Sequence, residues 1–413
     1  MSGSPPNKIA VVGGGAAGIT AAIAARRKGA SVTILESNQR IGKKLLATGN
    51  GRCNLTNITT SIANYYGNNP RFAFSALSQF GVEQTLAFFA RLGVAHKVEE
   101  EGKVFPFSLQ ASSVLDVLRY ELEDTGVEVL CEAEVVGIAH SKNGFTLALK
   151  SGGEFQADRV IITTGGKAAP YFGSTGSGYA LALSLGHSIV EPFPALVQLK
   201  LVSDYLKRIK GIKFEGTAEI VLDNKSLQSA RGEILFTEYG ISGPPILTLS
   251  RKAGECLKKN HSPWLKLVLL DSFTPGELEA LLAERFSNNP GKTLAFSFVG
   301  FLNKQLAPVI LKEAGVDLNK AAGQVTAAEL KKVARILLDW RFPVTGTTSW
   351  PAAQVTAGGV DVNDINSKTM ESRIVPKLYF AGEVLDIDGD CGGYNLQWAW
   401  SSGYIAGESA AAT

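Results

Sequence analysis

The clearest pattern of apolar and polar positions lies near the start of the chain. Lys8–Val12 is a short apolar run that is typical of a fully buried strand, and Ala16–Lys28 is an alanine-rich helical pattern closed by Gly29. Ser31–Leu35 is a second, β-branched run, and it ends at Glu36. A strand, a helix and a strand in such close succession predict a βαβ unit.

The middle of the chain alternates between helical and strand patterns. The patterns predict helices over Phe72–Leu92, Ala111–Thr125, Pro275–Arg285, Ala295–Ala307 and Ala327–Trp340, and a final helix from about Leu396. Strands are expected over Val127–Leu130, Glu134–His140, Phe145–Lys150, Arg159–Thr163 and Lys377–Phe380, and in a β-rich stretch over Leu196–Val202, Thr217–Leu222, Glu233–Phe236 and Trp264–Leu270.

This order predicts an α/β protein in which a Rossmann-like nucleotide-binding domain is interrupted by an insert. We expect the first part of that domain over residues 1–191, a β-rich barrel insert over 192–272, a helical insert over 273–345, and the second part of the domain over 346–413. No internal repeat is visible.

Composition narrows the class of protein. The chain has 413 residues with a formal net charge of +3, which is too balanced for a protein that grips polyanions along a basic face. Charged residues make up 19% of the chain and glycine contributes 44 positions, so a large buried interior and close backbone approaches are expected. We therefore expect no nucleic-acid partner.

The cysteines and histidines argue against a disulfide framework and against a metal site. The four cysteines form no CxxC pair, and the four histidines have no metal-ligand spacing. A cytoplasmic location is expected. Ile9–Ala25 has no charged residue, but its length, its glycines and the lack of a basic leader argue against a signal peptide or a membrane span.

Residues 13–18 read GGGAAG, which is the GxGxxG pattern between a strand and a helix. Gly13 permits the tight turn, Gly15 lets the backbone approach a pyrophosphate, and Gly18 lets the helix and the strand pack closely. Glu36 stands where an acid accepts hydrogen bonds from an adenosine ribose, and its charge repels a 2′-phosphate. The pattern therefore predicts FAD or NAD rather than NADP.

Two later strands favour FAD. Val160–Gly166 (VIITTGG) and Lys377–Glu383 (KLYFAGE) both end in small residues and resemble strands of flavoproteins of the glutathione-reductase superfamily. In those proteins the later acid lies beside the ribityl chain, the role that Glu383 or Asp386 would have here. Gly389–Leu396 opens the last helix, whose N–H groups could stabilise negative charge on the flavin.

Five further segments resemble one bacterial family across nearly the whole chain. They are Gly42–Asn57 (GKKLLATGNGRCNLTN), Gly173–Tyr179 (GSTGSGY), Leu235–Pro244 (LFTEYGISGP), Val355–Gly359 (VTAGG) and Ala381–Gly403 (AGEVLDIDGDCGGYNLQWAWSSG). The chain resembles the NAD(P)/FAD-dependent oxidoreductases of the aminoacetone-oxidase-like or bile-acid-reductase-like type. The resemblance implies an FAD domain with a barrel-and-helix insert. Glu238 and Cys391 depart from the family, in which His and Thr are common there.

The predicted cofactor contacts follow from the patterns and the resemblance. They are Gly13, Gly15, Ala16, Ala17, Gly18, Glu36, Lys44, Thr48, Gly49, Asn50, Arg52, Cys53, Asn54, Thr164, Gly165, Gly166, Gly382, Glu383, Asp386, Gly393, Tyr394, Asn395 and Leu396. Arg52 and the neighbouring lysines would offset phosphate charge, Arg52 by bidentate contacts. Cys53 and Cys391 are expected to be packing residues rather than redox thiols. No catalytic residue can be assigned; the candidates are Glu238, Tyr239 and Tyr394.

The leading hypothesis is an FAD-dependent oxidoreductase that transfers hydride to or from a small organic substrate. Two directions stay open, which are amine oxidation and NAD(P)H-driven reduction of a conjugated C=C bond. There is no second dinucleotide fingerprint, so NAD(P)H would bind transiently as electron donor. The alternatives are an NAD-dependent dehydrogenase and an FAD-binding protein that modifies RNA or serves as a scaffold. The sequence does not reveal the oligomeric state.

Overall fold

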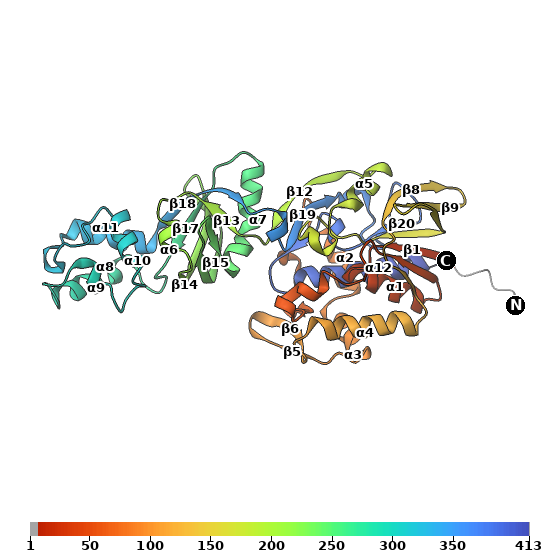
Figure 1. Ribbon diagram of the computed structural model, residues 1–413, viewed down its shortest axis with the longest axis horizontal. Coiled ribbons are helices and arrows are strands. Elements are labelled where there is room, and N and C mark those ends of the chain that lie inside the picture. Colours follow the sequence, from red (N-terminus) through yellow and green to blue (C-terminus); the bar gives the residue numbers. More distant parts are fainter. Residues whose placement is uncertain (1–6, 413) are drawn as a thin grey trace. The chain divides into compact units, whose positions relative to one another are not determined.

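The computed structural model describes residues 7–412, and the chain divides into two compact units (Figure 1). The first unit combines the residues up to Pro194 with those from Trp350 onward, and the second is Ala195–Ser349. The expected α/β class is confirmed, because a parallel-sheet domain is interrupted by a barrel with helices. The insert was predicted over 192–345, and the second unit covers nearly the same residues.

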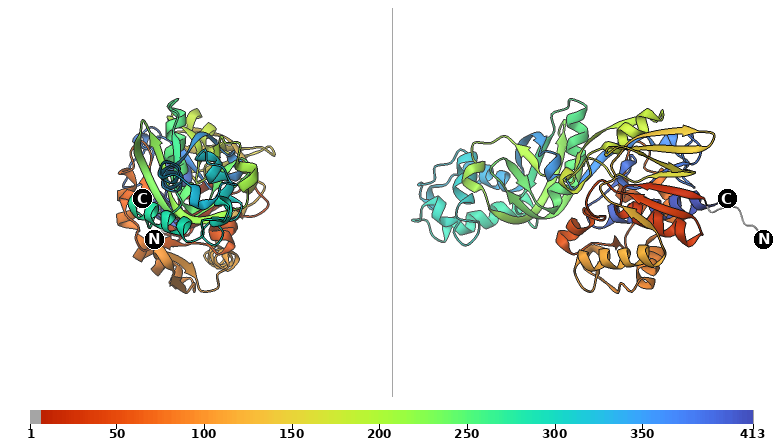
Figure 2. Two further views of the ribbon diagram at one scale, coloured as in Figure 1. Left: turned by 90° about the vertical axis from the view of Figure 1, so that its left-hand side faces the viewer. Right: turned by 45° about the vertical axis from the view of Figure 1, so that its right-hand side comes forward.

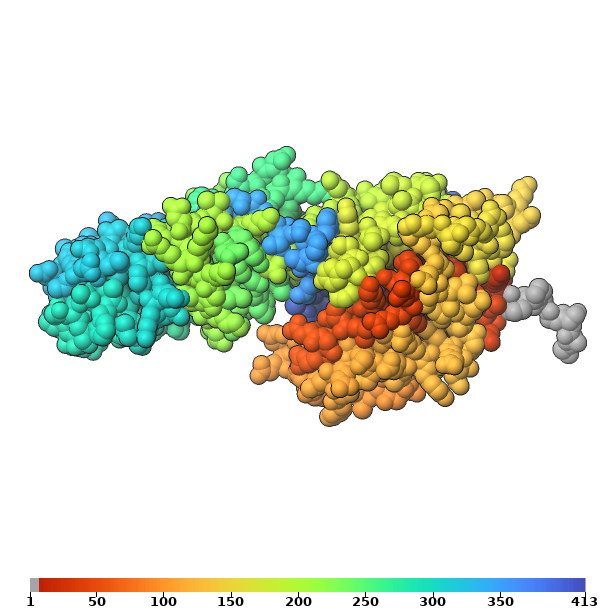
Figure 3. Space-filling view, in the orientation of Figure 1, coloured from red at the N-terminus to blue at the C-terminus, as the bar shows by residue number. Residues whose placement is uncertain are grey.

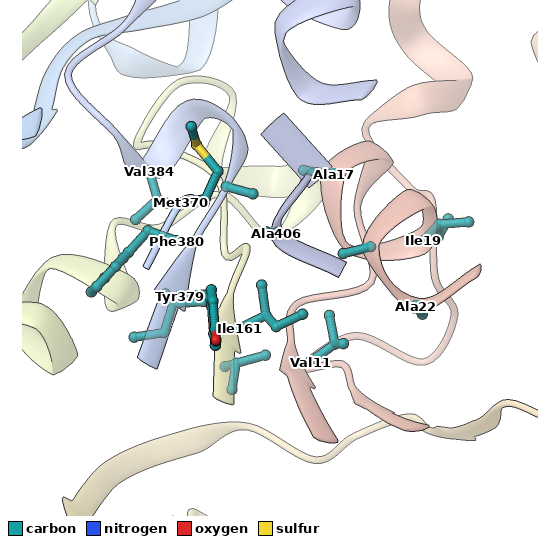
Figure 4. Packing of buried hydrophobic residues seen from close by; sticks show 14 of the residues in the cluster. Val11, Ala17, Ile19, Ala22, Ile161, Met370, Tyr379, Phe380, Val384 and Ala406 are labelled. Carbon is teal, nitrogen blue, oxygen red and sulfur yellow. The ribbon is translucent and has the colours of Figure 1, made fainter. Parts of the chain in front are cut away.

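The first unit is built on a five-stranded parallel sheet in the order β20-β11-β1-β2-β7. These strands are β1 (Lys8–Val12), β2 (Ser31–Leu35), β7 (Glu128–Leu130), β11 (Arg159–Ile162) and β20 (Leu378–Phe380). The register places Val11 beside Ile161 and Ile161 beside Tyr379, and Figure 4 shows these three side chains close together. The C-terminal part of the chain therefore returns into the sheet that the N-terminus begins.

Helices α1 (Ala16–Arg27) and α12 (Tyr394–Ala411) pack against each other through small residues. A Cβ atom added to Gly403 would overlap the carbonyl oxygen of Ala17, and one added to Gly407 would overlap that of Ala21. The two helix backbones are thus in direct contact, which holds both ends of the chain in one unit.

Two smaller sheets complete the first unit. The strands β8 (Val135–Ser141), β9 (Gly144–Leu149) and β10 (Glu154–Ala157) form an antiparallel meander, which appears as a layer separate from the red N-terminal strands in the right-hand view of Figure 2. The second small sheet has the order β3-β6-β5, with β3 at Thr56–Asn57, β5 at His96–Val98 and β6 at Lys103–Pro106. Figure 3 shows red N-terminal segments and yellow segments from the middle of the chain sharing one surface of this unit.

The second unit is a closed six-stranded barrel with helices. The barrel order is β13-β16-β15-β14-β17-β18, with β13 at Leu199–Leu201, β14 at Lys213–Leu222, β15 at Lys225–Phe236, β16 at Gly240–Ser242, β17 at Trp264–Val268 and β18 at Trp340–Thr347. Its core is filled by aromatic and branched side chains, among them Phe236 and Trp340. The helices are α6 (Leu206–Ile209), α7 (Pro244–Lys258), α8 (Pro275–Ser287), α9 (Leu294–Ser297), α10 (Leu306–Glu313) and α11 (Ala327–Leu338).

Several predicted elements were wrong in their limits. The helix expected over Phe72–Leu92 is two helices, α2 (Phe72–Gln79) and α3 (Val82–Arg91), because the chain leaves the helical conformation at Phe80 and Gly81 caps the next helix. The helix expected over Ala295–Ala307 is replaced by α9 and α10, since Gly300 adopts a φ of +84° between them.

The elements of the second unit that were not predicted include the helix α7 and the strand β18. The helix α7 begins with two prolines, which are compatible with the first turn of a helix but obscure the pattern. The strand β18 begins at Trp340, where the sequence pattern extended the preceding helix. In the structure that helix, α11, ends at Leu338. No helix within residues 7–412 is long and apolar enough to cross a membrane.

The contact between α1 and α12 can be tested with one methyl group. Gly407→Ala would place a methyl group on the Ala21 carbonyl oxygen, so we expect the unfolding free energy to fall by about 1–3 kcal/mol, as overpacking of a tight contact does. Chemical denaturation would measure the change. Gly276→Ala is the matched control, because its Cβ would meet no atom within 4 Å near the start of α8; this variant should keep or slightly gain stability.

A buried histidine predicts how stability depends on pH. His187 is 2% exposed, its Nε2 lies 2.7 Å from Ser372 Oγ, and burial lowers the pKa of its imidazole. The unfolded chain therefore binds a proton more readily, so stability should fall as pH drops below about 6.5. We expect His187→Gln to lose less stability than the unchanged chain between pH 7 and pH 5 in denaturant titrations. An equal loss in both proteins would contradict this assignment.

Candidate functional site

The glycine-rich loop after β1 has the geometry that the sequence predicted for a phosphate-binding turn. Gly13 adopts a φ of +106°, and a Cβ on Gly18 would overlap the Gly13 carbonyl oxygen. Gly15 differs, because a Cβ there would meet no protein atom within 4 Å. No atom of the described residues would clash with a Cβ at position 15, so the space beside this residue is open to a ligand.

The start of α1 adds free hydrogen-bond donors to this loop. Gly15 caps the helix, Ala16 and Ala17 form its first turn, and that turn contains no acidic residue. The first backbone N–H groups of a helix have no partner within the helix and carry the positive end of its dipole. The loop therefore presents backbone donors toward the open space at Gly15, as an anion site requires.

Glu36 lies beside the same loop, at the end of β2. Its buried carboxylate accepts hydrogen bonds from the backbone N–H of Gly14 at 2.7 Å and of Asn38 at 2.8 Å, and from Asn38 Nδ2 at 2.6 Å. These bonds fix the acid next to the glycine turn. Asn38 was not predicted; its signal was an amide two residues after the acid.

The end of β11 closes the other side of the loop. Thr163 Oγ1 donates to the carbonyl oxygen of Gly13 at 2.7 Å, whereas the predicted residue, Thr164, lies against Gly178. Both threonines lie beside the loop, since a Cβ on Gly13 would also lie 3.0 Å from Thr164 Cα; Thr163 was not predicted. Gly165 adopts a φ of +73°, which continues the turn.

Lys44, Glu383 and Thr356 meet beside Gly166. Lys44 Nζ lies 2.8 Å from Glu383 Oε2, and the backbone N–H of Thr356 donates to Glu383 Oε1 at 2.9 Å. A Cβ on Gly166 would overlap Thr356 Oγ1. The structure thus brings together two predicted residues from positions 44 and 383. It adds Thr356, which lies in the VTAGG segment but was not singled out.

Gly382 and Asp386 flank Glu383. A Cβ on Gly382 would lie 2.8 Å from the Cβ of Ala17, so this residue touches the first turn of α1. Asp386 is buried, and its Oδ2 accepts a hydrogen bond from the backbone N–H of Asn68 at 2.8 Å. The segment that carries Glu383 and Asp386 therefore contacts the first turn of α1, which begins directly after the dinucleotide loop.

The loop over residues 45–54 contains two residues other than glycine, Asn50 and Cys53, with left-handed backbone. Gly49 and Asn50 both have a φ of +56°, and the Thr48 hydroxyl donates to the Leu45 carbonyl at 2.6 Å. Arg52 lies over the Phe105 ring at 4.0 Å, and its Nη1 lies 3.1 Å from Glu99 Oε2. The bidentate phosphate contact of Arg52 stays a prediction; in this structure its guanidinium contacts Phe105 of β6 and Glu99, which lies between β5 and β6.

Cys53 is a packing residue in this structure. It is fully buried, and burial raises the pKa of its thiol to about 12, with a smaller opposing effect of Thr48. The thiol is therefore protonated at neutral pH, and a protonated thiol is a poor nucleophile. This supports the expectation that Cys53 is not a redox or tethering group. Cys391 is similar, since burial raises its pKa as well.

The start of α12 closes the group. Gly393 caps the helix with a φ of +105°, and a Cβ there would lie 3.0 Å from Asn54 Oδ1. Asn54 Oδ1 is buried and has no hydrogen-bond partner among the described residues. An unsatisfied buried acceptor beside free helical N–H groups is a position that a bound group with a donor would complete.

The three residues after Gly393 have structural roles that sequence patterns do not reveal. Asn395 Nδ2 donates to the carbonyl oxygens of Gly389 at 2.8 Å and Asp390 at 3.1 Å, so its side chain shapes the turn. The Tyr394 hydroxyl lies 3.0 Å from Thr59 Oγ1. Leu396 packs against the hydrophobic core. What this segment offers a ligand is therefore its backbone.

The other two catalytic candidates lie in the second unit. Glu238 is exposed and forms an ion pair with Lys210 at 2.7 Å, which lowers the pKa of its carboxyl group. Tyr239 is also exposed. Both lie in the unit of residues 195–349, and their catalytic role stays a prediction. Within residues 7–412, no cluster of three or more His, Cys, Asp or Glu side chains could hold a metal ion.

The residues present fit an extended dinucleotide such as FAD. The glycine turn, Glu36, the Lys44–Glu383 pair and the α12 N-terminus all lie in one unit, and Asn54 supplies an acceptor that lacks a partner among the described residues. When FAD is bound in such a site, it supplies the two-electron hydride chemistry.

The Gly15→Val variant tests FAD binding separately from the stability of the fold. Because the space at position 15 is empty and its backbone is extended, the fold should tolerate the side chain, whereas the pyrophosphate should not. We expect at least a tenfold loss of FAD affinity with a melting temperature of the cofactor-free protein within a few degrees of the parent. Fluorescence titration with FAD and thermal denaturation would measure the two effects. Unchanged flavin content would refute this placement of the phosphates.

Comparison with known proteins identifies the family of the chain. The family model described as the HI0933-like protein Rossmann domain matches residues 7–409. The chain is 39% identical over 407 residues to a 3-dehydro-bile acid delta(4,6)-reductase of Clostridium scindens, covering 98% of this chain and 99% of the relative. It is 32% identical over 400 residues to a ribosomal RNA dihydrouridine synthase of Haemophilus influenzae, covering 95% and 96%.

Solved structures show the same fold at low sequence identity. A 3-ketosteroid delta1-dehydrogenase from Sterolibacterium denitrificans superimposes with a TM-score of 0.51 at 12% identity, over 99% of this chain and 100% of that one. The chain belongs to the HI0933-like family of FAD-binding Rossmann proteins and is a flavin-dependent oxidoreductase.

Proposed function

We propose that this protein is an FAD-dependent reductase that saturates a carbon–carbon double bond conjugated to a carbonyl group. One observation carries the direction of the reaction. The relatives at 39% and 32% identity bear different names, a delta(4,6)-reductase of a 3-dehydro-bile acid and a dihydrouridine synthase. Both names describe the addition of two hydrogen atoms to a C=C bond that is conjugated to a carbonyl.

The chain's own residues would bind and orient the cofactor for this reaction. The N–H groups at the start of α1 would hold the pyrophosphate, and Glu36 the adenosine ribose. Glu383, already held by Lys44 and Thr356, would accept hydrogen bonds from ribityl hydroxyls. The α12 N-terminus would stabilise negative charge at the pyrimidine end of the flavin, which favours the reduced, hydride-donating form.

NAD(P)H is the proposed source of the electrons. The sequence holds one GxGxxG fingerprint, so a dedicated nicotinamide domain is not expected, and a transient encounter at the flavin is the simplest route. Under this proposal the enzyme works in two halves: NAD(P)H delivers hydride to the enzyme, and the conjugated substrate then receives a hydride and a solvent-derived proton.

Anaerobic half-reaction experiments test the proposed direction. The FAD-loaded protein is first reduced with NADH or NADPH while the visible flavin band is followed, and a 3-oxo bile acid with conjugated 4,6 double bonds is then added. We expect the flavin band to return and mass spectrometry to show the gain of two hydrogen atoms. A saturated 3-oxo bile acid is the matched control and should leave the flavin reduced. Bleaching of oxidised flavin by amines, with no response to the conjugated acid, would contradict the proposal.

The second candidate substrate is a uridine in ribosomal RNA. The distribution of charge along the chain supports this candidate. The overall charge of +3 hides an asymmetry: Ala195–Ser349 contains 21 Lys and Arg against 15 Asp and Glu, a formal charge of +6, while the rest of the chain carries −3. An asymmetry of charge between two parts of a chain is one sign of nucleic-acid or membrane contact. The same reduced protein, mixed with ribosomal RNA instead of the bile acid, distinguishes the two substrates.

A further inference from the structure

We propose that Tyr179 is a further FAD-binding residue, whose hydroxyl donates a hydrogen bond to an oxygen in the ribityl–flavin half of the cofactor. This inference rests on the proposed FAD site. The sequence placed Tyr179 at the end of the GSTGSGY segment that resembles the family, but it assigned the tyrosine no role.

The position of Tyr179 follows from α5 (Ser177–Ser184), which is packed tightly against the proposed site. A Cβ on Gly178 would overlap Thr164 Oγ1 and would lie 3.1 Å from Val384 Cγ2. Gly176 caps the helix, and a Cβ there would lie 3.2 Å from the Tyr179 ring. Helix α5 thus packs against the segments after β11 and β20, and the Tyr179 ring lies against the start of its own helix.

The Tyr179 hydroxyl has no hydrogen-bond partner among the described residues although the residue is only 8% exposed. Buried hydroxyl groups in folded proteins nearly always have a partner, since leaving one unsatisfied is costly. Tyr179 therefore has the property that marks a ligand contact: a rigidly placed polar atom that the protein itself does not satisfy.

The hydroxyl would act as a donor. Burial raises the pKa of Tyr179, and the negative charges of Glu383 and Asp386 raise it further, while Thr356 acts weakly in the opposite direction. The phenol therefore keeps its proton at neutral pH. A protonated phenol donates to an acceptor oxygen, and the ribityl hydroxyl and ring carbonyl oxygens of FAD are such acceptors.

The residues around the hydroxyl indicate which half of the cofactor it would contact. Glu383, Asp386 and Thr356 all come from the C-terminal return of the chain rather than from the glycine loop at residues 13–18 that would hold the adenosine diphosphate. The contact is therefore assigned to the ribityl–flavin half, and ADP, which lacks that half, should not form it.

Tyr179→Phe tests the inference because it removes only the hydroxyl. We expect the variant to bind FAD about 3–10-fold more weakly than the parent in fluorescence titrations of the cofactor-free protein, the range of one hydrogen bond. ADP affinity should not change. The melting temperature of the cofactor-free variant should equal or exceed that of the parent, since a polar atom without a partner has been removed. Tyr120→Phe is the matched control, because Tyr120 is 69% exposed, and it should change none of these values.

Three results would overturn the inference, and each is distinct from a failure of the proposed function. Unchanged FAD affinity would show that the hydroxyl makes no contact with the cofactor. An equal loss of affinity for FAD and for ADP would place the contact in the adenosine diphosphate half of the cofactor instead. A lower melting temperature of the cofactor-free variant would show that the hydroxyl is used within the protein. If the parent protein itself failed to bind FAD, the proposed function would fail first.

Discussion

The direct packing of α1 on α12 is the contact on which the rest of the FAD-binding unit depends. Gly403 and Gly407 let the backbone of the C-terminal helix touch the carbonyl groups of Ala17 and Ala21, so the two helices cannot move apart without losing a close-packed contact. The strand β20, which precedes α12, is thereby fixed beside β11, and Gly382 reaches the first turn of α1. A chain interrupted by 155 residues of insert returns in this way to complete a site that its first forty residues begin.

A buried glutamine extends this constraint from the helices to the loops. Gln397 is fully buried; it accepts a hydrogen bond from Thr56 Oγ1 at 2.5 Å and donates to Thr85 Oγ1 at 2.9 Å. The Trp400 indole N–H adds a bond to the Leu55 carbonyl at 2.9 Å. These bonds tie the loop after residue 48 to the start of α12, and they explain why Asn54 and Gly393 lie next to each other. The flavin end of the proposed site is therefore built by helix α12 rather than by the loop alone.

The sequence predicted the backbone framework of the site well but not its side-chain network. The βαβ unit, Glu36 and the late strand ending at Glu383 follow from periodicity and spacing, which are local properties. Thr163, Thr356 and Asn38 were missed because their roles depend on segments that come together only in the fold. Arg52 was assigned to phosphate from its charge, and only the structure reveals Glu99 and Phe105 as its partners. The breaks near Gly81 and Gly300 were hidden by apolar residues on both sides.

Two unsatisfied polar atoms and two residues with left-handed backbone lie where the cofactor is proposed to bind, and each has an energetic cost. Asn54 Oδ1 and the Tyr179 hydroxyl each lack a partner among the described residues, at a cost of about 1–3 kcal/mol per group. Asn50 and Cys53 hold left-handed backbone conformations, which also cost free energy in residues other than glycine. These costs are a sizeable part of the roughly 5–15 kcal/mol that stabilises a typical domain. A ligand that satisfies such groups binds only the folded chain, so its binding free energy adds to the stability of the fold. The strain in the loop and the missing partners are thus best understood as parts of a site whose folding is completed by its cofactor.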